Sequence, residues 1–417
     1  MEADFLSKAG GLWAAQLVNK AAVLGFSFVV GHRLGAEGVG VMASVLALAW
    51  VVGTLAGMGM PDRAVFRGAR EDISDDHRRL YGLFLASVFT VHLLMFQWAE
   101  ICAGVVSLEG VRLARGLIVG AGAQCMSSVG LGWLRGAARP RFEIGSSLAA
   151  AIILLGGVLM GAPLGLCWAA SGCAMLLGSL LGNWRERGII PKIPGFREPW
   201  NMLTSGHGYL LFGAGAWLIG NVDILLARAF FPAEAVGALQ VGTMAVRGLG
   251  LVPWVAATLM LRTCRLAWAS GVRPRTATWS IRAAGVGVLV AALCWIVMPL
   301  LARGHSIPVA AVERSAWAAM VWAPVLFTVL LLLPLSAQWH LGRTLRAIGM
   351  GLITQLGVGM VASDQLEVAM MVSVAGVGQL VTLIWLVRAL ASGPQEGIQM
   401  NPGAVVPGVS ASGGDGA

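Results

Sequence analysis

Residues 12–30, LWAAQLVNKAAVLGFSFVV, form an apolar segment long enough to cross a bilayer, yet Lys20 lies near its middle. A membrane-spanning helix needs roughly 20 predominantly apolar residues. An ammonium group at the centre of such a helix costs roughly 2.5–3.5 kcal/mol on insertion scales. The spacing of Gln16, Asn19, Lys20 and Ser27 places all four side chains on one helical face. We therefore expect this face to meet a polar cavity or other helices inside the membrane.

The composition is that of a polytopic membrane protein. Of the 417 residues, 57% are hydrophobic and 12% are charged, and the mean hydropathy is +0.79. We expect a retained first span and no cleavable signal peptide. The six cysteines lack metal or redox spacing and are predicted to be packing residues.

No catalytic motif is evident, and the hydrophilic segments contain no glycine-rich phosphate loop, so we expect neither an enzyme nor ATP hydrolysis in this chain. No cofactor is expected beyond a coupling H+ or Na+. The net charge of +9 does not point to nucleic acid, because the arginines lie between hydrophobic segments, where membrane topology explains them.

Hydropathy predicts an all-α fold with about twelve transmembrane helices. The predicted spans are 11–31, 38–60, 81–101, 116–134, 146–162, 164–182, 207–228, 235–261, 281–301, 316–337, 345–362 and 366–387. With the N-terminus inside, the inner segments hold 21 lysines and arginines and the outer loops hold six. This excess of positive charge on the inner side supports the number of spans and predicts cytoplasmic N- and C-termini.

The chain divides into two similar halves. AEGVG at 36–40 follows the first span, and AEAVG at 233–237 follows the seventh. Six spans per half predict two parallel six-helix bundles around a central cavity. The predicted division is a bundle at 1–182, a cytoplasmic linker at 183–206 that is rich in proline, a second bundle at 207–390, and a disordered tail at 391–417.

A second cation, Arg247, lies within the eighth span. Gln240, Thr243 and Arg247 form a polar stripe like that of the first span. Two interpretations remain open. Lys20 and Arg247 could bind an anionic substrate in the cavity, or they could pair with an acid such as Asp223 or snorkel, and only hold helices together.

Two further groups are candidate functional residues. Asn221 and Asp223 in the seventh span could bind a coupling ion. Four arginines, Arg63, Arg67, Arg135 and Arg139, follow the second and fourth spans and could line a cytoplasmic mouth. The positive-inside rule predicts these arginines equally well.

Residues 5–70 resemble the amino-terminal part of the bacterial Wzx-like polysaccharide flippases, a branch of the multidrug/oligosaccharidyl-lipid/polysaccharide exporter superfamily. The likeness lies in the polar-striped first helix, the turn RLGAEGVG at 33–40, the glycine-rich end of the second helix at 57–59 and the arginine run after it. Residues 221–250, NVDILLARAFFPAEAVGALQVGTMAVRGLG, resemble the seventh and eighth helices of that family. Together the two segments cover about a quarter of the chain.

This resemblance implies a multi-pass protein of the bacterial cytoplasmic (inner) membrane, a flippase that moves undecaprenyl-pyrophosphate-linked oligosaccharide units from the inner to the outer leaflet by alternating access. Lys20 and Arg247 would then bind the pyrophosphate, with the stripe residues Gln16, Asn19, Gln240 and Thr243 contacting sugar or phosphate. Membrane lipids, and possible polysaccharide polymerase and chain-length proteins, are the expected partners. The alternatives are an ion-coupled multidrug exporter of the same superfamily, a membrane-embedded polysaccharide polymerase or ligase, and a non-transporting scaffold.

Overall fold

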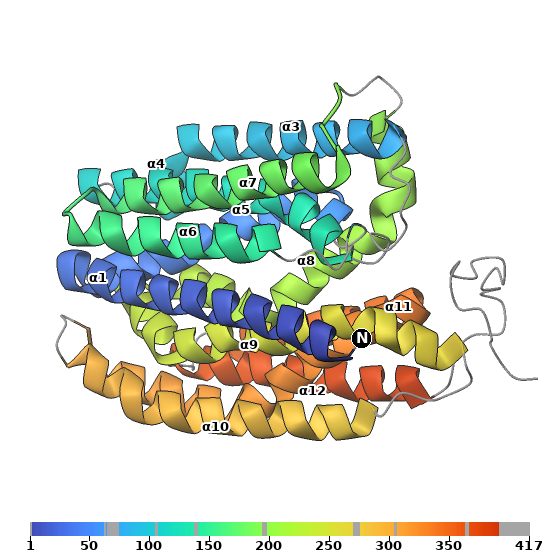
Figure 1. Ribbon diagram of the computed structural model, residues 1–417. Coiled ribbons are helices and arrows are strands. Elements are labelled where there is room, and N and C mark those ends of the chain that lie inside the picture. Colours follow the sequence, from blue (N-terminus) through green and yellow to red (C-terminus); the bar gives the residue numbers. More distant parts are fainter. Residues whose placement is uncertain are drawn as a thin grey trace, which may run out of the picture.

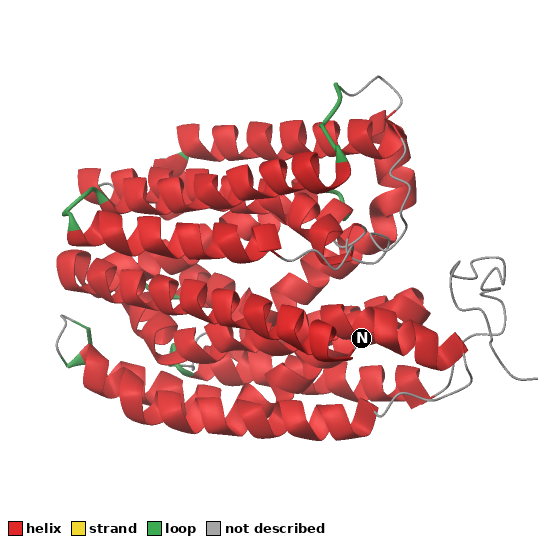
Figure 2. Ribbon diagram, in the orientation of Figure 1, coloured by secondary structure: helices red, strands yellow, loops and turns green. Residues whose placement is uncertain are grey.

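The computed structural model describes residues 2–61, 64, 75–104, 107–136, 141–193, 198–269, 276–303, 307–362 and 367–391. Within these ranges every regular element is a helix (Figure 2). In chain order (Figure 1) the helices are α1 (Glu2–Ala56), α3 (Asp75–Gln97), α4 (Ala99–Ala103), α5 (Leu108–Gly136), α6 (Arg141–Leu159), α7 (Leu164–Arg187), α8 (Glu198–Phe230), α9 (Ala233–Ala269), α10 (Thr276–Ala302), α11 (Val309–Ala362) and α12 (Met370–Ala391). The predicted all-α class is confirmed.

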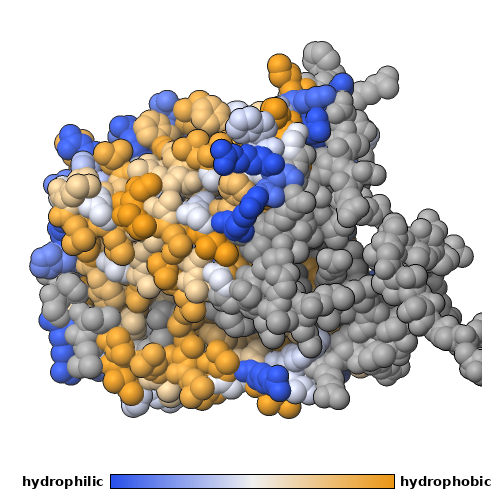
Figure 3. Space-filling model, viewed as in Figure 1, coloured by the Kyte–Doolittle hydropathy of each residue, from blue (hydrophilic) through white to orange (hydrophobic). Residues whose placement is uncertain are grey.

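Nine helical stretches of the described chain are long and apolar enough to cross a membrane. On the face drawn in Figure 3, apolar side chains dominate the middle of the molecule, and hydrophilic side chains gather toward both ends of the helices. This distribution is that of a multi-pass membrane protein, whose lipid-facing surface has to be apolar.

Two of the helices each contain two predicted spans. In α1 the break is at Gly35, whose φ of 68° and ψ of −169° lie in a region that is essentially restricted to glycine. In α11 the break is at His340, with φ −140° and ψ 56°. The breaks separate the predicted spans 11–31 from 38–60 and 316–337 from 345–362. The short turn predicted between the fifth and sixth spans is also present, with Gly161 at φ 78°.

The helices form two groups that meet along α1 and α9. The helices α3 to α7 pack mainly among themselves and on α1, and α8 to α12 pack mainly among themselves, whereas α1 packs on both groups and most extensively on α9. We call the end of the molecule at which α6 is followed by α7 and α10 by α11 the hairpin end, which lies at the left in Figure 1. The opposite end, at which α7 ends and the predicted linker follows, is the linker end, at the right.

Buried apolar residues show where the two groups are joined. One cluster contains residues of both groups, and its members near the hairpin end include Val30, Ala36, Leu113, Val158, Ala233, Ala302 and Ile307. Toward the linker end the core is divided. One cluster, with Tyr81 and Trp133, belongs to the first group, and another, with Phe212 and Leu335, belongs to the second. The bundles therefore share a core at the hairpin end and have separate cores at the linker end, where the turn after α1 still touches α8: a Cβ on Gly59 would lie 2.3 Å from the amide nitrogen of Leu210.

Both flanking helices extend into the predicted 183–206 linker. α7 ends at Arg187, with Gly188 as a left-handed C-cap, and α8 begins at Glu198. Pro199 falls in the first turn of α8, where the missing N–H of proline costs nothing. Residues 392–417, the predicted tail, lie outside the described part of the chain.

Replacing Gly35 with alanine tests the break in α1. An added Cβ would meet no atom within 4 Å, so the cost is backbone strain alone, about 1–3 kcal/mol. We expect a lower midpoint of thermal unfolding in detergent. Gly156→Ala is the matched control, because its Cβ also meets open space and its backbone is helical. An equal effect of both substitutions would contradict the assignment.

Candidate functional site

The polar residues predicted on α8 and α9 come together around Arg247. Arg247 Nη2 forms an ion pair with Asp223 Oδ2, and the two side chains are 13% and 3% exposed. Arg247 Nε donates to Thr243 Oγ1 at 2.8 Å. Nη1 donates to the carbonyl of Gly220 at 3.3 Å and to Asn221 Oδ1 at 3.4 Å. The guanidinium therefore has partners on each of its three nitrogens.

Local backbone geometry of α8 supplies part of this site. The N–H of Ile224 donates to Asp223 Oδ1 at 3.0 Å. Both oxygens of Asp223 therefore have a donor, because Oδ2 accepts from Arg247. Arg247 thus forms an ion pair with Asp223, as one of the two interpretations of the sequence predicted. Contact of Arg247 with an anionic substrate stays a prediction.

The remaining residues of the predicted stripe differ in their bonding. Thr243 donates its own hydroxyl to the carbonyl of Leu239 at 2.9 Å, which leaves its oxygen free to accept from Arg247. Gln240 is half-buried and forms no side-chain hydrogen bond with another described residue. It is thus the member of the stripe that retains free hydrogen-bonding capacity.

Two glutamines fasten α8 to the last helices. Gln355 Nε2 donates to the carbonyl of Ala375 at 2.8 Å and to that of Ile219 at 3.4 Å. Gln379 Nε2 donates to the same Ile219 carbonyl at 3.1 Å. These bonds hold the segment of α8 directly before Gly220, and so they position the ion pair within its bundle.

In the polar stripe of the first span, Gln16 forms a side-chain hydrogen bond with another helix, whereas Lys20 forms none within the described part of the chain. Gln16 Nε2 donates to Glu143 Oε1 on α6 at 2.9 Å. Asn19 is 7% exposed. Lys20 is half-buried and has no hydrogen bond or ion pair to any residue that the structure describes. The two predicted cations are therefore not equivalent, because Arg247 is neutralised by Asp223 and Lys20 is not.

Glu143 is a buried acid that the sequence analysis missed. Its side chain is fully buried and lies in the first turn of α6, next to α1. The fifth span was predicted from residue 146, so this carboxylate was assigned to a loop. An acid three residues ahead of an apolar run is typical of a first helical turn, where it interacts favourably with the helix dipole, and that signal could have placed it.

The four arginines predicted at a cytoplasmic mouth stay a prediction. Arg63, Arg67 and Arg139 lie outside the described residues. Arg135 belongs to the last turn of α5, and its side chain is also outside the described part.

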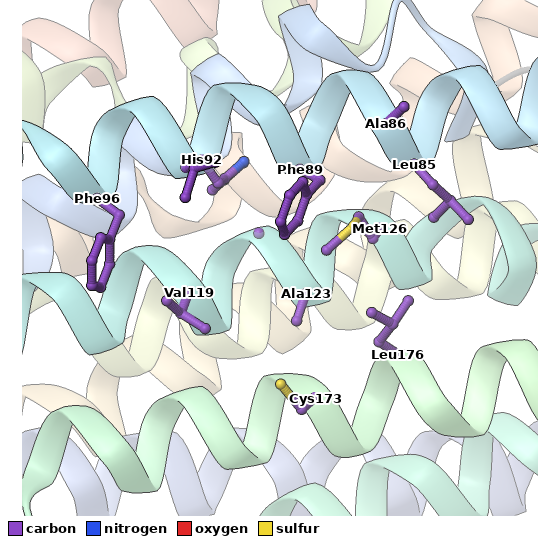
Figure 4. A pocket seen from close by; sticks show the side chains of 12 residues that line it. Leu85, Ala86, Phe89, His92, Phe96, Val119, Ala123, Met126, Cys173 and Leu176 are labelled. Atoms are coloured by element: carbon purple, nitrogen blue, oxygen red, sulfur yellow. The ribbon is translucent and has the colours of Figure 1, made fainter.

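A cavity of about 670 Å³ lies between α3, α5 and α7, away from the polar residues above (Figure 4). Its lining is almost entirely apolar, with His92 and Cys173 as the polar members. His92 is 5% exposed, and its Nδ1 lies 2.8 Å from the carbonyl of Val88 in the same helix. The cavity contains none of the predicted site residues and offers no charged group, so we do not assign the site to it.

No protein-family model and no curated protein matches this sequence. Solved structures do match. An inward-facing multidrug resistance MATE family transporter of the MOP superfamily superposes with a TM-score of 0.65 and 15% identity, over 92% of this chain and 98% of that one. The chain has the fold of the MOP superfamily transporters.

Two further structures agree with this result. A MOP superfamily transporter from Pyrococcus furiosus, described as having a binding pocket of reverse polarity that suggests a different function, has a TM-score of 0.63 and 15% identity, over 92% and 96% of the two chains. The MATE multidrug transporter DinF-BH, in complex with a ligand, has a TM-score of 0.62 and 13% identity, over 94% and 96%. These matches establish the fold, about twelve helices in two bundles, and leave the substrate open.

The Arg247–Asp223 pair gives a test by double substitution. Asp223→Asn and Arg247→Gln each leave a buried charge without its counter-ion, which costs about 3–5 kcal/mol. The double variant leaves two neutral groups, so we expect it to unfold at a higher temperature in detergent than either single variant. Additive losses of thermal stability would show that the two side chains are not coupled.

Proposed function

We propose that this protein is an exporter that works by alternating access. The division of the core carries the proposal: the bundles share buried residues at the hairpin end and have separate cores at the linker end. Two bundles that share a core at one end and touch through helix-end contacts at the other can rock against each other, which is the motion that alternating access between parallel repeats requires. The solved structures that share the fold are transporters and not enzymes, which argues against a polymerase or ligase.

Drug export is the first candidate for the substrate. Structures that share this fold over more than nine tenths of the chain are described as multidrug transporters, and one of them is in complex with a ligand. These comparisons support the multidrug exporter better than the oligosaccharide flippase that the sequence resemblance put first.

The polarity of the site favours a second candidate, an anionic substrate such as lipid-linked oligosaccharide. Cationic drugs are best bound by acids that remain accessible, whereas Glu143 is fully buried and Asp223 is 2% exposed and ion-paired. The half-buried charge without a partner among the described residues is Lys20. The relative with reversed pocket polarity indicates that this fold accommodates pockets of more than one charge.

For an anionic substrate, Lys20 is the first contact of the phosphate, and Gln16, Asn19 and Gln240 supply hydrogen bonds. Arg247 joins only when an anion competes with Asp223 for its guanidinium. Asp223 would then lose its counter-ion inside the membrane. In this proposal Asp223 and Asn221 bind the coupling ion, H+ or Na+, at that point, so that ion uptake is coupled to substrate binding.

Substitution of Lys20 separates the two candidates. The chain and its Lys20→Gln variant are expressed in a bacterial host lacking its own exporters, and accumulation of a cationic dye is measured. They are also expressed in a flippase-deficient host, and outer-leaflet exposure of lipid-linked oligosaccharide is measured. An anionic substrate predicts restored exposure that Lys20→Gln reduces at least tenfold and that Lys20→Arg retains.

A drug exporter predicts lowered dye accumulation that Lys20→Gln leaves unchanged. Ser27→Ala is the matched control, because Ser27 lies on the same face of α1 and its hydroxyl is bonded within α1. Its acceptors are the carbonyl of Val23 at 2.9 Å and, more weakly, Met42 Sδ at 3.8 Å. The proposal of an exporter fails if the wild-type chain changes neither dye accumulation nor oligosaccharide exposure.

A further inference from the structure

The two repeated motifs cross each other at the hairpin end. A Cβ added to Gly40 would lie 1.8 Å from the carbonyl oxygen of Ala233 and 3.1 Å from the amide nitrogen of Gly237. A Cβ added to Gly237 would lie 1.9 Å from the carbonyl oxygen of Ala36 and 3.1 Å from the amide nitrogen of Gly40. The contacts are reciprocal, as a two-fold axis between α1 and α9 requires. Backbones this close leave no room for any side chain at either glycine.

Two other contacts join the bundles at this end. Arg228, near the end of α8, donates to the carbonyls of Ala103 and Gly104 at the end of α4, at 3.4 Å each. Carbonyls at a helix C-terminus lack helical partners and attract cations. In addition, Ile307, which precedes α11 and is 5% exposed, packs on α1, since a Cβ on Gly31 would lie 3.0 Å from its Cδ1.

We propose that the crossing of AEGVG (36–40) with AEAVG (233–237) is the gate at the hairpin end, which is closed in this structure and held by Arg228 and Ile307. The inference rests on the proposed function, because an exporter closed at this end has to open there to release its substrate. Glycine suits such a contact. Two backbones without intervening side chains pack closely at this point. They can also separate without any change in interdigitated side chains.

The first experiment fixes the gate closed. Gly31→Cys and Ile307→Cys are introduced into a chain whose native cysteines are replaced by alanine, and are joined by a short bis-methanethiosulfonate reagent, which forms a reducible disulfide with each thiol. We expect transport to fall at least tenfold on crosslinking and to recover on reduction. Gly157→Cys with native Cys167 retained is the matched control. Their Cβ atoms would be 3.5 Å apart, which suits a disulfide, and both lie within one bundle, so transport should be unchanged.

The second experiment does not depend on transport. Val236 is fully buried within the crossing, so Val236→Cys reports whether it opens. We expect a membrane-impermeant thiol reagent to label Val236→Cys at least tenfold faster in a Gly40→Leu background than beside the native glycine. Gly156→Leu is the control, because its Cβ meets open space, and it should leave the labelling rate unchanged.

Three outcomes would contradict the proposal that this crossing is a gate. One is normal transport by the fully crosslinked Gly31/Ile307 pair. Another is unchanged labelling of Val236→Cys in folded Gly40→Leu protein. The third is failure of both Gly40→Ala and Gly237→Ala to accumulate as folded protein, since the crossing would then be a permanent joint. If the uncrosslinked protein transports neither substrate, the proposed function fails. The labelling rates of Val236→Cys still show whether the crossing can open.

Discussion

Direct backbone contact between α1 and α9 determines how the two bundles meet. Because Gly40 and Gly237 have no Cβ, each glycine lies against the carbonyl of an alanine in the opposite helix. Such close approach brings the flanking residues of both helices into the one apolar cluster that spans the bundles. Farther along their helices the bundles keep separate cores, and they touch again where a Cβ on Gly59 would lie 2.3 Å from the amide nitrogen of Leu210.

Charge inside the membrane is handled in two different ways by the two halves. In the second bundle Arg247 is neutralised by Asp223 and bonded to Thr243, so its desolvation is offset by partners on every nitrogen. In the first bundle Lys20 has no such partner among the described residues, and the nearby acid, Glu143, is bonded by Gln16. A pair of this kind holds its helices together, whereas an ammonium without such a partner is the feature on which the proposal of an anionic substrate rests.

Much of the fold could be predicted from the sequence. Gly35 and Gly161, at positive φ, mark turns that interrupt apolar runs, and both turns were placed correctly. Helix ends were predicted less well, because α8 begins at Glu198 and α9 continues to Ala269, beyond the apolar segments that hydropathy detects. The same reliance on hydropathy left Glu143 outside its helix. In the candidate site, the association of Arg247 with Asp223 was foreseen as an alternative, and the bond from Gln16 to Glu143 was not.

The sequence by itself determined that the chain crosses a membrane about twelve times, and it predicted that the two halves are related, because hydropathy and repetition are properties of consecutive residues. Only the tertiary structure decided which polar groups are satisfied. Gln16 and Glu143 are 127 positions apart, and Arg247 and Asp223 lie on different helices. Whether such groups meet depends on which helices are neighbours and how each is rotated about its axis, and that is set by packing contacts such as the crossing of Gly40 and Gly237.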